Sequence, residues 1–569
     1  MNERSEPRAN WTRLLPFGTW LGAYRREWLA SDAIAGVTLA AYAIPVSLAY
    51  AAMAGLAPQV GIYGYMLGGL GYAAFGTSRQ LAVGPTSAIS LMIAATVGAL
   101  AGGDAVLYAQ IASLSACAVA VLCFVAWLFK LSVLVRLVSD SILVGFKAGA
   151  GLTIMMSQLP SLLGVAGGGH NFFDRIVKLA GQFGDINLSV LSVGAVALLL
   201  LLLGERLLPG KPVGIAVVAL SIALATLLGL SSLGVPVTGR IPEGLPALGW
   251  PTFGLLEFDD LFPLAAGCVL LAYIEGVSAA RSFAAKHGYG LDVRQEFLGL
   301  GFANLATAFG HGYPVAGGLS QSAVNDSAGA RTPLALIVCS LTLALCLLFF
   351  AGLLTNLPKA VLAAIVFAAV YRLVDIRALL RMWRISRIDF YAASIALIAV
   401  LLLGILQGVL LASIASIFLL LARASNPNVA FLGRLPGSGR YSDRARHEGV
   451  EPLAGVIAFR PEASLLYINA EGVLETVLSA VRNSPDIRLV ICDLSASPYI
   501  DLAGTRMLHD LYDELVSRRI SLSIVGAHAQ LRDLLRAEGL AEKIDSSQWL
   551  RTLDGVLGSV QSNSDQTSR

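Results

Sequence analysis

The chain has 569 residues, of which 56% are hydrophobic and 14% are charged, and its mean hydropathy is +0.72. A soluble protein averages about 25% charged residues, so this composition excludes an ordinary soluble enzyme and indicates a polytopic membrane protein. The formal net charge of +3 gives no reason to expect a nucleic-acid partner. The six cysteines form no CxxC motif and no Cys/His cluster, so neither a metal site, a cofactor nor a disulfide framework is predicted.

The chain begins with a polar and basic segment, residues 1–30, which is predicted to be cytoplasmic. No apolar stretch followed by a small-residue cleavage site occurs there, so no cleavable signal peptide is expected. A transmembrane domain is predicted over residues 31–424, where apolar segments of membrane-spanning length follow one another almost without pause.

About fourteen spans are predicted in this domain. They lie near residues 33–56, 60–76, 85–101, 105–129, 138–162, 187–204, 212–230, 259–285, 292–310, 319–328, 332–352, 357–372, 388–404 and 406–422. Several are shorter than the ~20 residues that a full crossing needs, which is typical of half-helices and of tilted partners.

Basic residues in the predicted loops indicate the orientation. With a cytoplasmic N-terminus, fifteen Lys and Arg residues fall in the predicted inner loops and four in the outer ones. The four outer ones are Arg175, Lys178, Arg240 and Lys359. Since cytoplasmic loops carry the excess of Lys and Arg, both termini are predicted to be inside.

Two breaks rich in small residues interrupt the apolar pattern, at Gly84–Ser90 and at Gly317–Ser322. Pro, Gly and hydroxyl residues at membrane depth indicate discontinuous helices, whose freed backbone groups need protein or cavity partners. Two such breaks in corresponding halves are the best sequence pointer to the binding site of a transporter. A helix that begins inside the membrane turns its positive end toward that site, which favours an anion.

After Arg423 the composition changes. Residues 425–452 are predicted to be a linker, residues 453–560 a small α/β domain, and residues 561–569 a disordered tail. The α/β pattern predicts strands over Gly455–Phe459, Ser464–Ile468, Arg488–Leu494 and Ile520–Val525, and helices over Gly472–Arg482, Ala503–Val516, Gln530–Glu538 and Trp549–Val560.

Several long motifs in order resemble the sulfate permease (SulP) family, the bacterial relatives of the solute carrier 26 anion transporters. They are residues 32–63, Gly76–Arg79 with Gly84 and Pro85, Gly317–Asn325 with Ala328–Thr332, and, in the tail, Asp493–Gly504. The last motif resembles the STAS domain, which is shared by sulfate transporters and anti-sigma factor antagonists.

The resemblance implies two inverted repeats of seven spans, divided into a core domain and a gate domain as in the uracil-permease-like fold. Spans three and ten are then short half-helices that meet near the midplane between short strands, and spans one and eight complete the substrate cleft. The two breaks fall at the starts of the third and tenth predicted spans.

The site that this resemblance implies comprises hydroxyls and backbone N–H groups at the two half-helix starts. Its members are Thr86, Ser87, Ser320 and the backbone at Ala88 and Gln321, with Tyr50 and an unwound Ala43–Pro45 segment lining the same cleft. The alternatives are that these hydroxyls merely bond a helix carbonyl, and that Tyr50 belongs to an interfacial aromatic belt.

Glu275 lies near the middle of the span over residues 259–285, where a carboxylate costs at least ~2.5–3.5 kcal/mol on insertion scales. The family places a coupling or charge-balancing acid here, so Glu275 is predicted to couple transport to protons; an acid paired with a neighbouring helix is the alternative. Many family members have an arginine where this chain has Gln321. Without that cation, a divalent anion needs a protonated Glu275.

Three further polar groups have simpler interpretations. Lys147 is best explained as a helix-end residue that extends its ammonium toward the interface. Asn304 and Asn325 are predicted to make hydrogen bonds between helices. In the STAS motif Leu502 occupies the position of the phosphorylatable serine of anti-sigma antagonists, so that switch is absent there, and a role in assembly or trafficking is favoured.

The sequence therefore predicts a secondary active anion transporter of the bacterial inner membrane, not an enzyme, that works by alternating access as a homodimer. Its substrate is sulfate, bicarbonate or a dicarboxylate such as fumarate, moved with H+. A sodium-coupled (Na+) bicarbonate importer and an anion exchanger are the alternatives within transport. A regulatory scaffold with a vestigial membrane part is the alternative from another class.

Overall fold

The computed structural model describes residues 20–22, 24–131, 140–169, 171–208, 213–239, 244–251, 258–438 and 440–558. Most of the predicted N-terminal segment and all of the predicted tail, residues 561–569, lie outside this part of the chain. The chain divides into two compact units, Met1–Ser416 and Ile417–Arg569.

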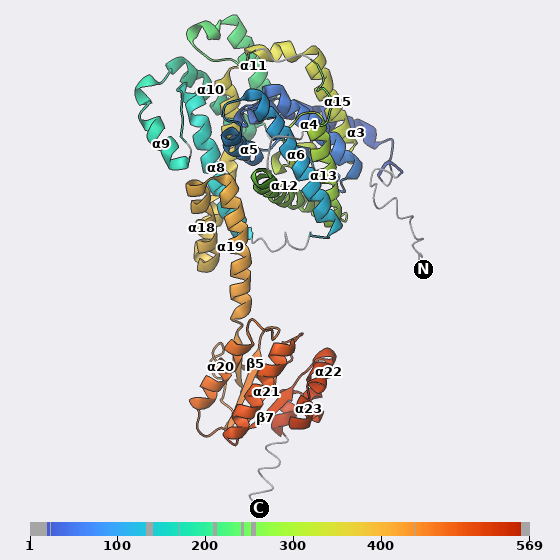
Figure 1. The fold of residues 1–569 in the computed structure, drawn as a ribbon, viewed down its shortest axis with the longest axis vertical. Coiled ribbons are helices and arrows are strands. Elements are labelled where there is room, and N and C mark those ends of the chain that lie inside the picture. Colours follow the sequence, from blue (N-terminus) through green and yellow to red (C-terminus); the bar gives the residue numbers. More distant parts are fainter. Residues whose placement is uncertain are drawn as a thin grey trace, which may run out of the picture. The chain divides into compact units, whose positions relative to one another are not determined.

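Each of the fourteen predicted spans corresponds to one helix (Figure 1). The first seven are α3 (Trp28–Met53), α4 (Pro58–Phe75), α5 (Ser87–Leu100), α6 (Ala105–Leu128), α8 (Asp140–Leu163), α10 (Leu188–Leu207) and α11 (Val213–Leu227). The second seven are α12 (Phe258–His287), α13 (Val293–Phe309), α14 (Leu319–Ser327), α15 (Leu334–Phe349), α16 (Lys359–Val370), α18 (Arg387–Leu403) and α19 (Ile405–Ser425).

By length and apolar composition alone, five of these helices can cross a membrane, namely α3, α6, α8, α12 and α19. The short amphipathic helices α9 (Phe172–Ala180) and α17 (Ile376–Ile385) lie between spans. Single 3-10 turns occur at Phe183–Asp185, Leu230–Leu233, Ala351–Asn356 and Tyr371–Leu373. The helical unit is therefore built from a few complete spans with shorter apolar helices packed between them.

Packing partners correspond between the two sets of seven helices. Helix α3 packs on α15, and its counterpart α12 packs on α6; likewise α13 packs on α6, and α4 packs on α15. In the other group, α8 packs on α18 and α16 on α10. This exchange of equivalent partners is the pattern of an inverted repeat, and it separates a group around α3, α4, α12 and α13 from a group around α8, α10, α16 and α18.

Helix α3 differs from the prediction of an unwound Ala43–Pro45 segment, because it is continuous through Pro45. The proline removes one backbone donor, which leaves the carbonyl of Ala41, four residues earlier, without its helical partner, and the Ser47 hydroxyl donates to the Ile44 carbonyl at 3.1 Å. Membrane helices tolerate proline where their surroundings satisfy the freed backbone groups.

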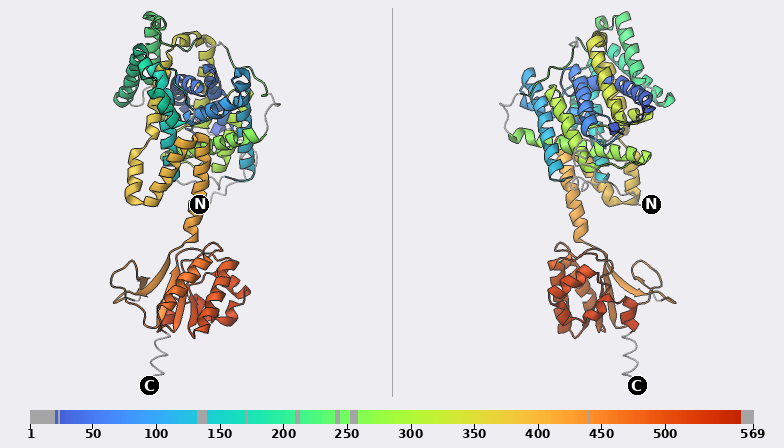
Figure 2. Two further views of the ribbon diagram at one scale, coloured as in Figure 1. Left: turned by 60° about the vertical axis from the view of Figure 1, so that its left-hand side comes forward. Right: turned by 90° about the vertical axis from the view of Figure 1, so that its right-hand side faces the viewer.

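The C-terminal unit is a five-stranded sheet in the order β4-β3-β5-β6-β7, with helices against it (Figures 1 and 2). The strands are β3 (Val429–Arg434), β4 (Tyr441–Asp443), β5 (Val456–Pro461), β6 (Leu489–Asp493) and β7 (Ser521–Val525). The helices are α20 (Ala470–Arg482), α21 (Leu502–Ser517), α22 (Ala529–Ala537) and α23 (Leu540–Lys543), with a 3-10 turn at Ser546–Leu550. Strands β5, β6 and β7 are parallel, and β3 and β4 are antiparallel.

Successive side chains along the central strands point to opposite faces of the sheet, so the apolar core is divided between the two faces. On β6, Val490 and Cys492 belong to the large cluster that contains the apolar sides of α20 and α21. Ile491, between them, packs on the opposite face with Leu553 and Val556 of the last turn of helix. Buried on both faces, β5 and β6 contain continuous apolar runs over Val456–Phe459 and Leu489–Cys492, as parallel strands usually do.

Three predictions for this unit need correction. The predicted linker 425–452 contains β3 and β4, because Val429–Arg434 pairs with β5 and extends the sheet. No strand forms over Ser464–Ile468 among the described residues; Leu465 makes only an isolated bridge to Ile500. The last helix begins at Leu553, and Trp549 lies in the preceding 3-10 turn.

Close packing of α3 on α4 requires a glycine at position 61. A Cβ atom there would lie 2.0 Å from the Ser47 carbonyl oxygen. We expect Gly61→Ala to lower stability by about 1–3 kcal/mol, the usual cost of overpacking, and thermal unfolding of the detergent-purified chain would measure the loss. Gly214→Ala is the control, since nothing lies within 4 Å of a Cβ there. Equal melting temperatures for the two variants would contradict this account of the helix crossing.

Candidate functional site

Two short helices begin directly after a pair of short antiparallel strands inside the helical unit. Strand β1 (Val83–Gly84) pairs antiparallel with β2 (Ala316–Gly317), with Val83 opposite Gly317 and Gly84 opposite Ala316. Helix α5 follows β1 and has 14 residues, while α14 follows β2 and has 9. Since an α-helix rises about 1.5 Å per residue, neither is long enough for a complete crossing. The two breaks in the sequence are therefore the starts of two discontinuous helices.

Both helices present backbone donors at their starts. The residues before them, Thr86 and Gly318, have extended backbones, and neither caps its helix through a side chain. The first intrahelical bonds are made by the N–H groups of Ser90 and Ser322. The preceding N–H groups have no partner within their own helices, and helix starts of this kind are suited to binding anions.

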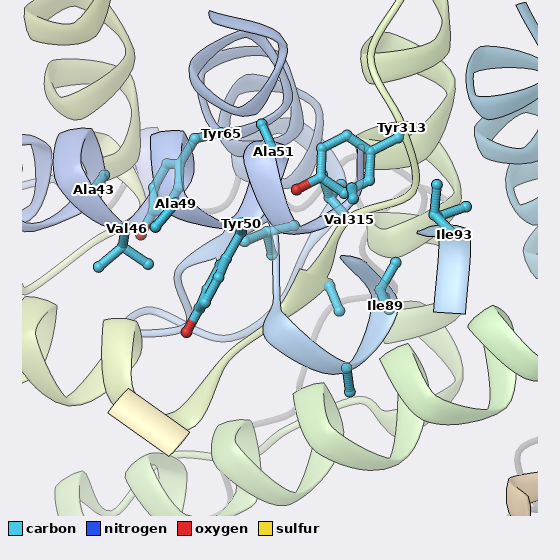
Figure 3. Packing of buried hydrophobic residues seen from close by; sticks show 14 of the residues in the cluster. Ala43, Val46, Ala49, Tyr50, Ala51, Tyr65, Ile89, Ile93, Tyr313 and Val315 are labelled. Atoms are coloured by element: carbon cyan, nitrogen blue, oxygen red, sulfur yellow. The ribbon is translucent and has the colours of Figure 1, made fainter. Parts of the chain in front are cut away.

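Around the start of α5 the structure brings together Tyr50, Thr86, Ser87 and Ala88, all less than 9% exposed. The Tyr50 hydroxyl lies near the Ser87 side chain. The Thr86 hydroxyl is buried and has no hydrogen-bond partner in the described part of the chain. Figure 3 shows the Tyr50 ring extending from α3 beside the start of α5, near Tyr313 and Val315. Buried hydroxyls normally have partners, so the lone Thr86 hydroxyl is available for a ligand.

The two predicted residues at the start of α14 lie differently from each other. Ser320 is exposed, whereas Gln321 is 4% exposed. The Gln321 amide turns back over Gly318, and its Nε2 donates to the Ala316 carbonyl at 3.3 Å. The Gln321 side chain therefore braces β2, so its backbone N–H and Ser320 are the groups left to face a ligand.

Glu275 lies beside the same crossing. The next residue, Gly276, packs so closely on β2 that a Cβ added at Gly317 would lie 3.0 Å from the Gly276 Cα. Glu275 is half-buried, and it lies near enough to Lys147 for their opposite charges to interact. Lys147, which the sequence suggested to be a helix-end residue, is half-buried on α8 and lies within electrostatic range of the acid.

Several bracing residues around the strands had been predicted only as bonds between helices or not at all. Asn304 on α13 accepts from the Val315 N–H at 2.9 Å and donates to the Val315 carbonyl at 3.1 Å. Ser322 accepts from the Ala82 N–H at 2.9 Å, and Asn325 donates to the Gln80 carbonyl at 3.0 Å. Irregular backbone inside a membrane must find such partners. Their sequence signal was a polar residue within or next to a predicted span.

Glu296, on α13, is a buried acid in a predicted span that sequence reasoning passed over. It is fully buried and accepts hydrogen bonds from the Tyr72 hydroxyl at 2.7 Å, the Thr77 N–H at 2.9 Å and the Thr77 hydroxyl at 2.5 Å. These contacts hold the turn between α4 and β1. An acid in an apolar span was the signal that could have found it.

The arrangement suits reversible binding of an anion. Its polar groups are hydroxyls, amides and helix N-termini, with one acid and one lysine at the edge. In the described part of the chain, no group of three or more His, Cys, Asp and Glu residues could hold a metal ion.

Comparisons with known proteins match nearly the whole chain. The sequence profile of the sulfate permease family matches residues 29–417, and that of the STAS domain matches residues 449–554. A probable sulfate transporter of Mycobacterium tuberculosis is 33% identical over 531 residues, which cover 93% of this chain and 95% of the relative. A probable sulfate transporter of Arabidopsis thaliana is 30% identical over a match that covers 95% of this chain and 83% of the relative.

Solved structures share the fold at low identity. The murine Solute Carrier 26 family member A9 anion transporter, in the inward-facing state, matches 99% of this chain and 96% of its own, with a TM-score of 0.88 and 21% identity. The transmembrane domain of the cyanobacterial bicarbonate transporter BicA matches 69% of this chain and 98% of its own, with a TM-score of 0.60 and 22% identity.

We expect Asn304→Ala to loosen β2, because both polar groups of Val315 then lose their partner. An unsatisfied buried group costs about 1–3 kcal/mol, so the melting temperature should fall, and binding of anions at the start of α14 should weaken. Thermal unfolding and uptake of labelled sulfate into proteoliposomes would measure the two effects. Thr342→Ala is the control, since its hydroxyl bonds only the Val338 carbonyl of its own helix. If both variants behaved alike, the bracing role of Asn304 would be wrong.

Proposed function

Because this chain belongs to the sulfate permease family, we propose that it is a secondary active transporter that carries an oxyanion together with a proton. The family and the fold predicted from the sequence motifs are confirmed by the matches to nearly the whole chain. The proposed substrates are small oxyanions: sulfate, bicarbonate or a dicarboxylate such as fumarate. The names of similar proteins mention sulfate and bicarbonate.

The observation that carries the proposal is the pair of helix starts at the β1–β2 crossing, with the partnerless Thr86 hydroxyl beside one of them. An oxyanion needs several fixed donors, and donors held in advance avoid the cost of ordering them on binding. A vestigial membrane part would have no reason to keep these donors arranged, so the proposal favours transport over a regulatory scaffold. In this proposal Tyr50, Thr86, Ser87, Ala88, Ser320 and Gln321 bind the substrate.

Proton coupling follows from the charges near this site. When Glu275 is ionised, it offsets the positive charge of Lys147, with which it interacts. When Glu275 takes up a proton, the charge of Lys147 is no longer balanced, and an anion is attracted more strongly. By linkage, the anion then favours protonation to the same extent. This supports symport. In this proposal Lys147 supplies the positive charge that many family members supply with an arginine at the position of Gln321.

The membrane setting is part of the proposal. The excess of basic residues in the predicted inner loops supports both termini in the cytoplasm, and we propose the bacterial inner membrane as the location. We also propose that the chain acts as a homodimer and that its STAS domain serves assembly or trafficking. Leu502 at the start of α21 supports the absence of a serine phospho-switch there.

Glu275→Gln tests the coupling. The neutral amide cannot exchange a proton. We therefore expect an inward proton gradient to stimulate uptake of labelled sulfate, bicarbonate or fumarate into proteoliposomes about tenfold less than in the parent chain, which corresponds to ~1.4 kcal/mol. Ser278→Ala, an exposed site one turn along the same helix, is the control. Unchanged proton-driven uptake in the Gln variant would contradict the coupling role. Stimulation by an imposed sodium gradient in its place would favour the sodium-coupled alternative.

Gln321→Arg tests the charge argument. A fixed cation at this position is expected to lower the half-saturation concentration for divalent sulfate by about three- to tenfold and to weaken its dependence on pH. Gln321→Met is the matched variant, because it removes the bond to the Ala316 carbonyl without adding charge. If Arg changed neither the affinity nor the preference for divalent anions, the neutral-site argument would fail.

A further inference from the structure

A cavity of about 630 Å³ in the helical unit adjoins the site described above. Helices α3 and α8 reach it by their C-terminal parts, at Met53 and Pro160, α5 reaches it by Leu91 and Ala94, and α16 by its N-terminal Lys359. With a cytoplasmic N-terminus, the ends of α3, α8 and α16 that line the cavity face outward. None of the residues proposed above to bind substrate or proton lines this cavity.

The charged residues among the described lining are cations only. Arg175 and Lys359 line the cavity, and no Asp or Glu is found among the described residues that do so. These are two of the four basic residues that the sequence places in outer loops. A fold that brings two of four scarce cations to one cavity, without a carboxylate, creates an electropositive site.

Arg175 is held in position and incompletely satisfied. Its Nε donates to the Gly169 carbonyl at 3.2 Å, whereas Nη1 is buried and has no hydrogen-bond partner in the described part of the chain. Burial lowers the pKa of the Arg175 guanidinium, because part of it is removed from water. A half-buried cation without a counterion is unfavourable unless an anion binds it.

The loop before α9 is built around this arginine. Gly169 has a φ of +105°, and a Cβ there would lie 2.7 Å from the Arg175 backbone nitrogen. Gly167 exchanges two hydrogen bonds of 2.9 Å with the Gln182 side chain, which closes the loop. The guanidinium is therefore fixed before any ligand arrives, which lowers the entropy cost of binding.

From this geometry we propose that the cavity is a recruitment site, in which Arg175 and Lys359 bind a small divalent oxyanion before it reaches the helix starts. This deepens the proposed function and rests on it. The planar fork of arginine suits two oxyanion oxygens, and lysine adds a second point charge. Leu91, which also lines the cavity, follows Ser87 by one helical turn, about 6 Å along α5. A captured anion is therefore concentrated close to the transport site.

Protection from chemical modification tests the site directly. In the detergent-purified full chain, sulfate should slow the acylation of Lys359 by a water-soluble amine reagent, relative to chloride at the same ionic strength. At a sulfate concentration about twice the Kd, the rate should fall about threefold, since occupancy divides the free fraction by 1 + [L]/Kd. Lys178 is the matched control, because it lies on the same helix as Arg175 and pairs with Asp174 at 3.5 Å.

Variants at Arg175 complete this experiment. Arg175→Gln should abolish the protection of Lys359, whereas Arg175→Lys, which keeps the charge, should retain part of it. Equal slowing at Lys359 and Lys178, or no slowing at either, would overturn the proposal. So would full protection in the Gln variant, provided that it elutes as a single folded species.

Uptake separates this proposal from the proposed function. In cells that express the full chain, Arg175→Gln with Lys359→Gln should raise the external KM for sulfate about three- to tenfold and leave the maximal rate unchanged, since only charge-assisted contacts at entry are lost. An unchanged KM in an active transporter would overturn the recruitment site. If the parent chain carried none of the tested anions while sulfate still protected Lys359, the proposed function alone would fail.

Discussion

The short antiparallel contact between β1 and β2 is the constraint on which the rest of the helical unit depends. Two residues of each strand cross where two helices begin, and the bilayer offers no water to satisfy their backbone groups. Protein groups must do so, which explains why Asn304 and Ser322 bond the backbone around these strands. Close packing of Gly276 on Gly317 then brings Glu275 to the start of α14. The residues that hold the two strands together therefore also hold the candidate binding site.

Two glutamates within predicted spans, Glu275 and Glu296, show how surroundings decide a role. Glu296 is fully buried and receives three hydrogen bonds from Tyr72 and Thr77, so its carboxylate is satisfied and its contacts hold a turn. Glu275 is half-buried and shares its surroundings with Lys147 on another helix. A charge without hydrogen-bonded partners can respond to the binding of an anion, whereas a charge in a closed network is already satisfied. The residue type, a glutamate within an apolar span in both cases, does not distinguish the two roles.

Hydrophobic length and small-residue breaks were enough to locate the spans and the starts of α5 and α14, because these features depend on local composition. Predictions from local sequence were wrong where the structure of a segment depends on residues elsewhere in the fold. Pro45 looked like a break, but a continuous helix surrounds it, with Ser47 bonding a nearby carbonyl. Residues 425–452 looked like a linker, although Val429–Arg434 pairs with a strand more than twenty residues later. Turn-forming residues mark the ends of a short strand as readily as those of a linker.

By itself, the sequence determined the class of protein, the order of the spans and the two points at which helices begin inside the membrane, and the resemblance of its motifs indicated the family. The class, the spans and the breaks follow from composition and periodicity, which are properties of neighbouring residues. Only the tertiary structure decided which polar groups lie near one another: Lys147 within electrostatic range of Glu275, and the Gln321 amide on its own strand; it also placed Arg175 and Lys359 around one cavity. Charges and hydrogen bonds act over a few ångströms in space, and the residues that make them are separated by up to two hundred positions along the chain.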